Sequence, residues 1–268
     1  MPTRRETFGV GAATALALLA RRARAADDDP WPSLAAQIFD GKPISSGADV
    51  LAIDAPYRAM DAALVPVDIS ILPGADGARR VRRLTLVVDA NPSPLAAQFE
   101  FGADAGIDHL STRVRVNDYT NIHAVAEMTD GALLAVSRFV KAAGGCSAPA
   151  LTGTANAIPL GTMRWRLLPQ KPDAPAGTRE AQLMIRHPNY SGMQMNQLTR
   201  LYIPADFIQK LRIWQGDRPL LAVAGGISLS ENPEFRFRFR PEGTAPFRAD
   251  AEDSKGHRFH SEFPAAAV

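Results

Sequence analysis

Short apolar runs separated by turn-forming residues fill the first half of the chain after residue 64. These runs are 65–72, 81–89, 98–101, 110–116, 122–128 and 133–140. Turn formers follow several of them, as at Pro73-Gly74, Asn91-Pro92 and Asp130-Gly131. Strands of this length and spacing, with no alternation of strand and helix, predict an antiparallel β-sandwich or barrel.

The same pattern returns in the second half. The runs there are 181–187, 199–203, 211–214, 220–224, 235–240, 247–253 and 258–263. In 235–240 phenylalanine and arginine alternate strictly, which places the aromatic rings on one face of a strand and the guanidinium groups on the other. A half-buried strand explains this pattern, and a base-stacking platform for nucleic acid is the alternative. Residues 215–218, Gln-Gly-Asp-Arg, predict a hairpin turn between two strands.

Two segments depart from the strand pattern. Residues 27–46 combine helically spaced apolar positions with turn formers, which predicts one short helix followed by a loop. Residues 141–179 are crowded with glycine and proline, which predicts a flexible linker or arm. The chain thus divides into two β domains, 33–140 and 180–264, each long enough for its own core.

The first 25 residues predict an export signal. An apolar run over 8–20 follows Arg4-Arg5 and precedes the small residues of 23–25, so cleavage is expected near Ala25. The paired arginines resemble a twin-arginine signal, although both the twin-arginine and the general export routes stay open. This segment carries +4 of a net charge of +2, so the rest of the chain is slightly negative, which argues against nucleic acid. We expect a periplasmic protein without a membrane span.

The single cysteine, Cys146, follows Gly144 and Gly145 and precedes Ser147, Ala148 and Pro149. It has no intramolecular disulfide partner, and a lone thiol in an exported protein suggests chemistry or a Cys146-linked dimer. Its small neighbours do not provide an apolar core, so we expect an exposed thiol on a mobile arm. A buried structural cysteine and an exposed thiol without function are the alternatives. A slender, mobile segment suits a covalent carrier better than a catalytic nucleophile, which needs a rigid base and oxyanion site.

No other residues form a convincing site. His257 and His260 lie three apart in a predicted strand and therefore on opposite faces, and the other histidines, at 109, 123 and 187, are scattered. The aspartates at 27–29 fit a solvated terminus better than a calcium loop. We therefore predict no metal, cofactor or catalytic residue.

The residues around Cys146 and those of the second half resemble a known family. The segment 126–131 and the double-glycine cysteine motif at 140–146 are similar to the end of SoxY, the carrier of periplasmic sulfur oxidation. The segments 185–188, 203–208 and 230–237 are similar to SoxZ, its partner subunit. The resemblance spans about 33–264 and identifies the chain as a fused SoxYZ-like carrier of the type associated with quinoprotein dehydrogenases. It implies two immunoglobulin-like antiparallel β-sandwich domains joined by the arm.

The resemblance also implies a function. Cys146 corresponds to the cysteine that holds sulfur intermediates, and Gly144 and Gly145 to its flexible approach. The implied cargo is thiosulfate, sulfide or sulfite, and the implied partners are sulfur-oxidation enzymes or a quinoprotein dehydrogenase with its cytochrome. Here the arm continues past Cys146 into the second domain, whereas in SoxY it ends nearby. The alternatives are a non-covalent docking module and a cysteine-dependent hydrolase or transferase that uses His123 or His109 as its base.

Overall fold

A computed structural model describes residues 29–73, 80–149, 158–170, 172 and 174–265. The predicted signal segment, residues 1–25, therefore lies outside the described residues. The chain divides into two compact units, residues 1–41 and residues 42–268. Within the described part of the chain, no helix combines the length and apolar character needed to cross a bilayer.

The first unit contains one described helix, α2 (Trp31–Ile38). Pro30 precedes it, and the Asp29 carboxylate accepts a hydrogen bond from the Trp31 N–H at its first turn. Proline at a helix start is favourable because the missing N–H has no partner there in any case. The predicted short helix is confirmed.

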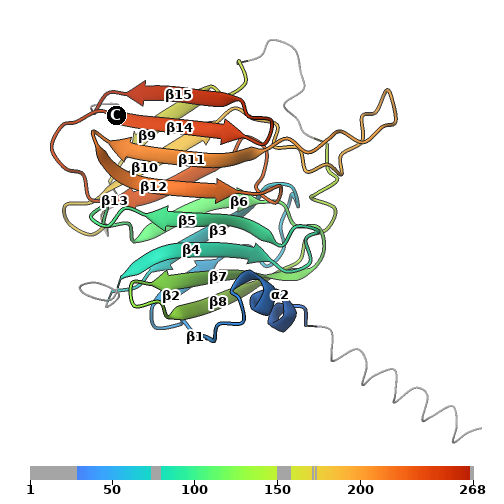
Figure 1. The fold of residues 1–268 in the computed structure, drawn as a ribbon, viewed down its shortest axis with the longest axis horizontal. Coiled ribbons are helices and arrows are strands. Elements are labelled where there is room, and N and C mark those ends of the chain that lie inside the picture. The colour runs from blue at the N-terminus through green and yellow to red at the C-terminus, as the bar shows by residue number, and fades with distance from the viewer. Residues whose placement is uncertain (1–28, 74–79, 150–157, 171, 173, 266–268) are drawn as a thin grey trace, which may run out of the picture. The chain divides into compact units, whose positions relative to one another are not determined.

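The second unit consists of two β-sheets packed face to face (Figure 1). The first-half strands are β1 (Ile44–Ser46), β2 (Leu51–Asp54), β3 (Val65–Ile71), β4 (Val81–Val88), β5 (Leu95–Phe101), β6 (His109–Val114), β7 (Thr120–Met128) and β8 (Leu133–Val140). The second-half strands are β9 (Met163–Leu168), β10 (Arg179–Ile185), β11 (Ile208–Gln215), β12 (Arg218–Gly225), β13 (Glu234–Phe239), β14 (Phe247–Asp253) and β15 (Arg258–Phe263). Apart from the parallel pair β1 and β8, the paired strands run antiparallel, and the predicted all-β sandwich class is confirmed.

The two halves of the chain join edge to edge in both sheets. One sheet has the order β1-β8-β7-β4-β5-β12-β11-β14-β15, and the other β2-β3-β6-β13-β10-β9. The junctions are β5 with β12 in the first sheet and β6 with β13 in the second. Phe99 and Phe235, from different halves, pack edge to face with ring centroids 6.2 Å apart. The core is therefore continuous between the halves, whereas the sequence suggested a separate core for each.

The alternating segment 235–240 folds as predicted. Phe235, Phe237 and Phe239 are fully buried, while Arg236 pairs with Glu180 at 2.8 Å on the other face of β13. The predicted hairpin between β11 and β12 is also present.

Three predictions about local structure were wrong. The segment 199–203, expected as a strand, contributes only an isolated bridge at Tyr202. Part of the predicted linker forms β9, which pairs along its whole length with β10. The loop expected after α2, up to residue 46, contains β1, and β2 lies in a stretch for which no strand was predicted. β1 pairs with β8, which is distant in the sequence, whereas β2 and β9 pair with the strands that follow them, β3 and β10. The glycine, proline and turn-forming residues around these short strands concealed them in the sequence.

Candidate functional site

Cys146 lies just beyond the end of β8 and is buried. Its side chain is free of any disulfide and has no solvent-exposed area. The preceding glycines are bound to the chain after β6, because the N–H groups of Gly144 and Gly145 donate to the carbonyls of Asn117 and Val116, each at 2.9 Å. The segment that carries the thiol is thus docked along the first-half sandwich.

Glycine is required at positions 144 and 145 for different structural reasons. Gly144 has a φ of +79°, a conformation that residues with a side chain rarely adopt. At Gly145, an added Cβ would lie 2.0 Å from the carbonyl oxygen of Ala62, so only glycine fits without a shift of the backbone. Both residues therefore allow the close docking of this segment, and their predicted role in arm flexibility stays a prediction.

The second half of the chain closes over Cys146. The Ser191 hydroxyl donates a hydrogen bond to the carbonyl of Cys146, and the Ser191 N–H donates to Gln194 Oε1 at 2.8 Å. Both Ser191 and Gln194 are buried. The cysteine thus lies where the two halves of the chain meet.

A buried arginine lies beside the same segment. Arg115 has 0% relative exposure, and its terminal nitrogens donate to the carbonyls of Gly145 at 3.1 Å and Asn189 at 3.4 Å. Its Nε is buried and makes no hydrogen bond. Burial lowers the pKa of Arg115, while the negative charges of the Glu231 and Asp61 carboxylates act in the opposite direction. Arg115 therefore holds a positive charge in the interior, next to the thiol.

The thiol itself is protonated in this position. Burial raises the pKa of Cys146 to about 11, and the positive charge of Arg115 opposes this rise only in part. The thiolate is the nucleophilic form of cysteine, so the docked thiol is a poor nucleophile at neutral pH.

The predicted exposure of Cys146 was wrong. Its sequence neighbours are small, but residues far away in the chain, Arg115 and Ser191, enclose it. Small neighbours also let the backbone approach Ala62 closely, which favours docking as much as mobility. Residues 150–157 of the predicted arm lie outside the described residues.

Each of the five histidines lies beside an aspartate. His123 Nε2 is 3.1 Å from Asp89, and His109 Nε2 is 3.4 Å from Asp68. His260 Nδ1 lies 2.6 Å from Asp250. The two histidines considered as bases for a cysteine enzyme are thus engaged with carboxylates.

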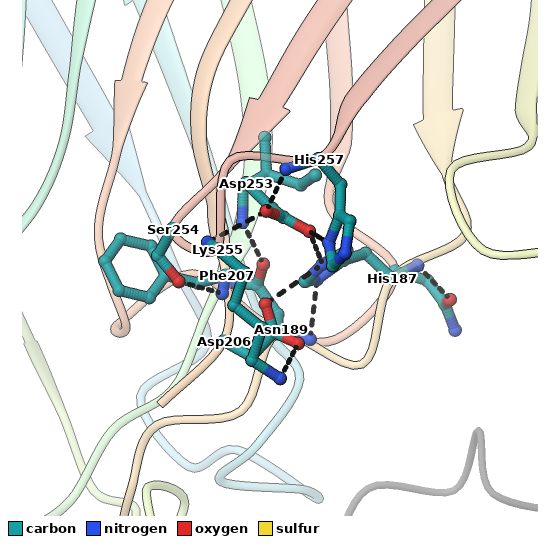
Figure 2. A network of polar contacts seen from close by, with 10 residues as sticks. His187, Asn189, Asp206, Phe207, Asp253, Ser254, Lys255 and His257 are labelled. Atoms are coloured by element: carbon teal, nitrogen blue, oxygen red, sulfur yellow. Dashed lines mark hydrogen bonds and ion pairs between the residues drawn. The ribbon is translucent and has the colours of Figure 1, made fainter. Parts of the chain in front are cut away.

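His187 belongs to a buried polar network in the second half (Figure 2). Its Nε2 lies 3.6 Å from a carboxylate oxygen of Asp206 and 3.6 Å from one of Asp253. Lys255 Nζ contacts Asp206 at 2.7 Å, and His257 Nδ1 contacts Asp253 at 2.7 Å. Burial lowers the pKa of His187, against the effect of the two carboxylates, so a neutral ring is favoured.

This network is the one described group that has the residue types of a metal site. Potential ligand atoms of His187, Asp206 and Asp253 all lie within 4.8 Å of one another. However, His187 Nδ1 accepts the N–H of Asn189 at 3.1 Å, so the neutral ring carries its proton on Nε2, the atom that faces the carboxylates. Metal-bound histidines instead donate from the second ring nitrogen. We interpret the group as a structural hydrogen-bond network.

Arg115 and Ser191, which enclose Cys146, gave no signal in the sequence. His187 and Asp206 lie in segments that carry the SoxZ resemblance, but no pattern indicated that they meet. Arg115 continues an ordinary alternating strand, and the members of the His187 network are far apart along the chain. Only the pairing of β11 with β14 brings Asp253 near Asp206.

Comparison with known proteins identifies the two halves. The family model for "Sulfur oxidation protein SoxY" matches residues 35–146, and that for "Sulphur oxidation protein SoxZ" matches residues 167–264. No curated protein matches the chain.

Solved structures with a similar arrangement include two kinds of protein. One is the sulfur carrier protein SoxY from Chlorobium limicola f thiosulfatophilum, at 24% identity and a TM-score of 0.34, covering 42% of this chain and 91% of that one. Another is a superoxide reductase (neelaredoxin) from Ignicoccus hospitalis, at 14% identity and a TM-score of 0.32, covering 35% and 81%. The assignment rests on the two family models, which occur in tandem and of which the first ends at Cys146. The chain therefore belongs to the SoxYZ-like family of sulfur oxidation proteins, with a SoxY domain and a SoxZ domain fused in one polypeptide.

Proposed function

We propose that this protein is a periplasmic carrier that holds a sulfur intermediate covalently on Cys146 and presents it to partner enzymes. The observation that carries this proposal is the position of the free thiol, at the last residue of the SoxY match and under residues of the SoxZ half. The protein supplies attachment and protection, and the partners supply the redox chemistry.

Loading requires that the segment leave its docked position. In the docked state the thiol is inaccessible and protonated, whereas an exposed cysteine has a pKa near 8.5 and is partly ionised at neutral pH. Undocking breaks the hydrogen bonds of Gly144, Gly145 and Cys146 described above. On the side of the segment these are backbone groups, which water can replace once the segment is exposed, while their partners include the Arg115 guanidinium and the Ser191 hydroxyl.

The cargo expected from the family is an inorganic sulfur species, such as thiosulfate. Attachment of thiosulfate forms one S–S bond and releases a proton and two electrons: RSH + S₂O₃²⁻ → RS–S–SO₃⁻ + H⁺ + 2e⁻. A haem of a partner cytochrome is the class of acceptor that takes these electrons. A quinoprotein dehydrogenase with its cytochrome is the further partner that the likeness to dehydrogenase-associated fusions suggests.

The intact mass of the protein tests this function. Protein is isolated from its native periplasm without reductant and compared with the reduced sample and with Cys146→Ser. A reducible added mass that maps to Cys146 and corresponds to sulfur or sulfonate groups is expected. The start of the isolated chain near residue 26 would confirm export in the same spectrum.

A bare thiol under conditions where the pathway is active contradicts the carrier function. It would favour a non-covalent docking module, in which Cys146→Ser retains full activity. A disulfide-linked dimer through Cys146 requires the same undocking, so we expect it to form in air only slowly and to disappear with reductant.

A further inference from the structure

Arg115 is the one fully buried arginine among the described residues, and the charges of Glu231 and Asp61 compensate only part of the cost of burying it. Its two hydrogen bonds go to carbonyl oxygens, which carry no net charge, and its Nε–H is buried without an acceptor. A guanidinium has five N–H donors and forms its strongest hydrogen bonds with anionic oxygens. A buried donor without a partner costs free energy, so this position favours an additional acceptor.

The location of this charge matches the cargo. Arg115 binds the carbonyl of Gly145, the residue directly before Cys146, so the guanidinium and the thiol share one buried environment at the junction of the halves. A conjugate formed from thiosulfate carries a sulfonate at its free end, with three oxygens that accept hydrogen bonds. A buried anion needs a paired cation, and here one is already present.

We infer that Arg115 binds the anionic sulfonate end of a conjugate on Cys146 when the segment is docked. This inference rests on the proposed carrier function and adds a specificity: the docked position selects and protects anionic conjugates over neutral ones. Arg115 acts as a binding residue and takes no part in bond formation.

Two conjugates that are both attached to Cys146 through an S–S bond, one anionic and one neutral, test the inference. Tetrathionate gives the anionic one by exchange at sulfur: RSH + S₄O₆²⁻ → RS–S–SO₃⁻ + S₂O₃²⁻ + H⁺. Methyl methanethiosulfonate gives the neutral one: RSH + CH₃SO₂SCH₃ → RS–SCH₃ + CH₃SO₂H. The measured quantity is the rate at which dithiothreitol removes each group, divided by the rate for the same group on N-acetylcysteinamide. This division cancels the intrinsic reactivity of each disulfide.

In the wild-type protein we expect the anionic conjugate to be protected about tenfold more than the neutral one. Arg115→Gln should abolish this difference, and Arg115→Lys should reduce it, because an ammonium lacks the fork geometry of the guanidinium. Arg113→Gln is the matched control: Arg113 lies two residues earlier, in β6, pairs with Glu234 at 3.0 Å and should leave the difference unchanged.

Equal protection of the two conjugates in the wild-type protein overturns the inference, even if Arg115→Gln does not fold. A difference that is unchanged in Arg115→Lys or Arg115→Gln also overturns it. These outcomes are separate from the test of the carrier function, because the conjugates are made chemically. If native protein carries no adduct, the carrier function is contradicted, but Arg115 can still bind anions. If the two conjugates are equally protected, the carrier function can still hold, but Arg115 does not bind the sulfonate.

Discussion

The surroundings of His187 and those of Cys146 are both buried and polar, but they are held together by different kinds of contact. Around His187, charged side chains face one another, and Asp253 accepts the N–H groups of Lys255 and His257 as well as the His257 ring. Around Cys146, the contacts are made chiefly by backbone groups of Gly144, Gly145 and Cys146.

This difference indicates which region can open. Exposed backbone groups exchange their partners for water at little cost, whereas a buried charge that loses its partner is strongly destabilising. We therefore expect the His187 network to be the harder of the two to open, and the undocking of the Cys146 segment, which the proposed carrier function requires, to cost less. The two regions are adjacent, because Asn189 donates its N–H to His187 and accepts from Arg115.

The largest effect is expected from breaking the His187 network. Asp253→Ala removes a fully buried carboxylate that accepts several hydrogen bonds, and we expect a loss of about 3–5 kcal/mol in the free energy of unfolding. Asp250→Ala, on the same strand, removes a half-exposed partner of His260 and should cost below about 1 kcal/mol. Urea unfolding measures both. A similar loss in the two variants would contradict the structural role of the network.

Undocking the Cys146 segment should have a smaller effect on stability and a large one on reactivity. Gly145→Ala places a Cβ against the Ala62 carbonyl, so we expect a loss of about 1–3 kcal/mol and alkylation of the thiol by iodoacetamide at least about tenfold faster. Gly131→Ala is the control, because a Cβ at Gly131 meets open space, while its positive φ, which Gly145 lacks, still makes alanine costly there. If both variants accelerate alkylation equally, the thiol reacts through global unfolding and the local docking has no role.

The two regions should respond to opposite ends of the pH scale. The pKa of Cys146 is raised to about 11, so unfolding releases a proton from the thiol above about pH 9, and stability falls as the pH rises through 9 to 11. The pKa of His187 is lowered by burial, so the unfolded state binds a proton more readily and stability falls as the pH drops below about 6.5.

Thermal unfolding at a series of pH values measures these two contributions. Cys146→Ser should reduce the alkaline loss only, and His187→Gln should reduce the acid loss only. An alkaline loss that is the same in Cys146→Ser and in the wild-type protein would mean that the docked thiol ionises normally.

The smallest effect is expected at Ser191. Ser191→Ala removes the hydroxyl that donates to the Cys146 carbonyl, and we expect a loss of about 1 kcal/mol together with alkylation of the thiol a few times faster. Ser147→Ala is the control, because the Ser147 hydroxyl donates to the Gly144 carbonyl within the same segment, at 3.2 Å. Equal alkylation rates in the two variants would indicate that Ser191 does not hold the segment.

Local patterns predicted much of the fold. The alternation at 235–240 was sufficient to predict a strand, and the residues of 215–218 were sufficient to predict a hairpin turn. Both features depend on adjacent residues. The segment 199–203 had the composition of a strand but has no neighbouring strand to pair with along its length. β9 is the opposite case: its surroundings predicted a linker, but it is a strand because it pairs with β10.

The sequence by itself determined the β class, the family and the residue that carries the thiol, because alternation, turn residues and a motif around Cys146 are all local properties. The tertiary structure decided that the two halves share their sheets and that the thiol is buried. Burial and a raised pKa depend on what surrounds an atom in space, and here Arg115 and Ser191 come from distant parts of the chain. The position of the Arg115 charge next to the thiol likewise depends on the fold, because the docking of the Cys146 segment brings Arg115 and the thiol together.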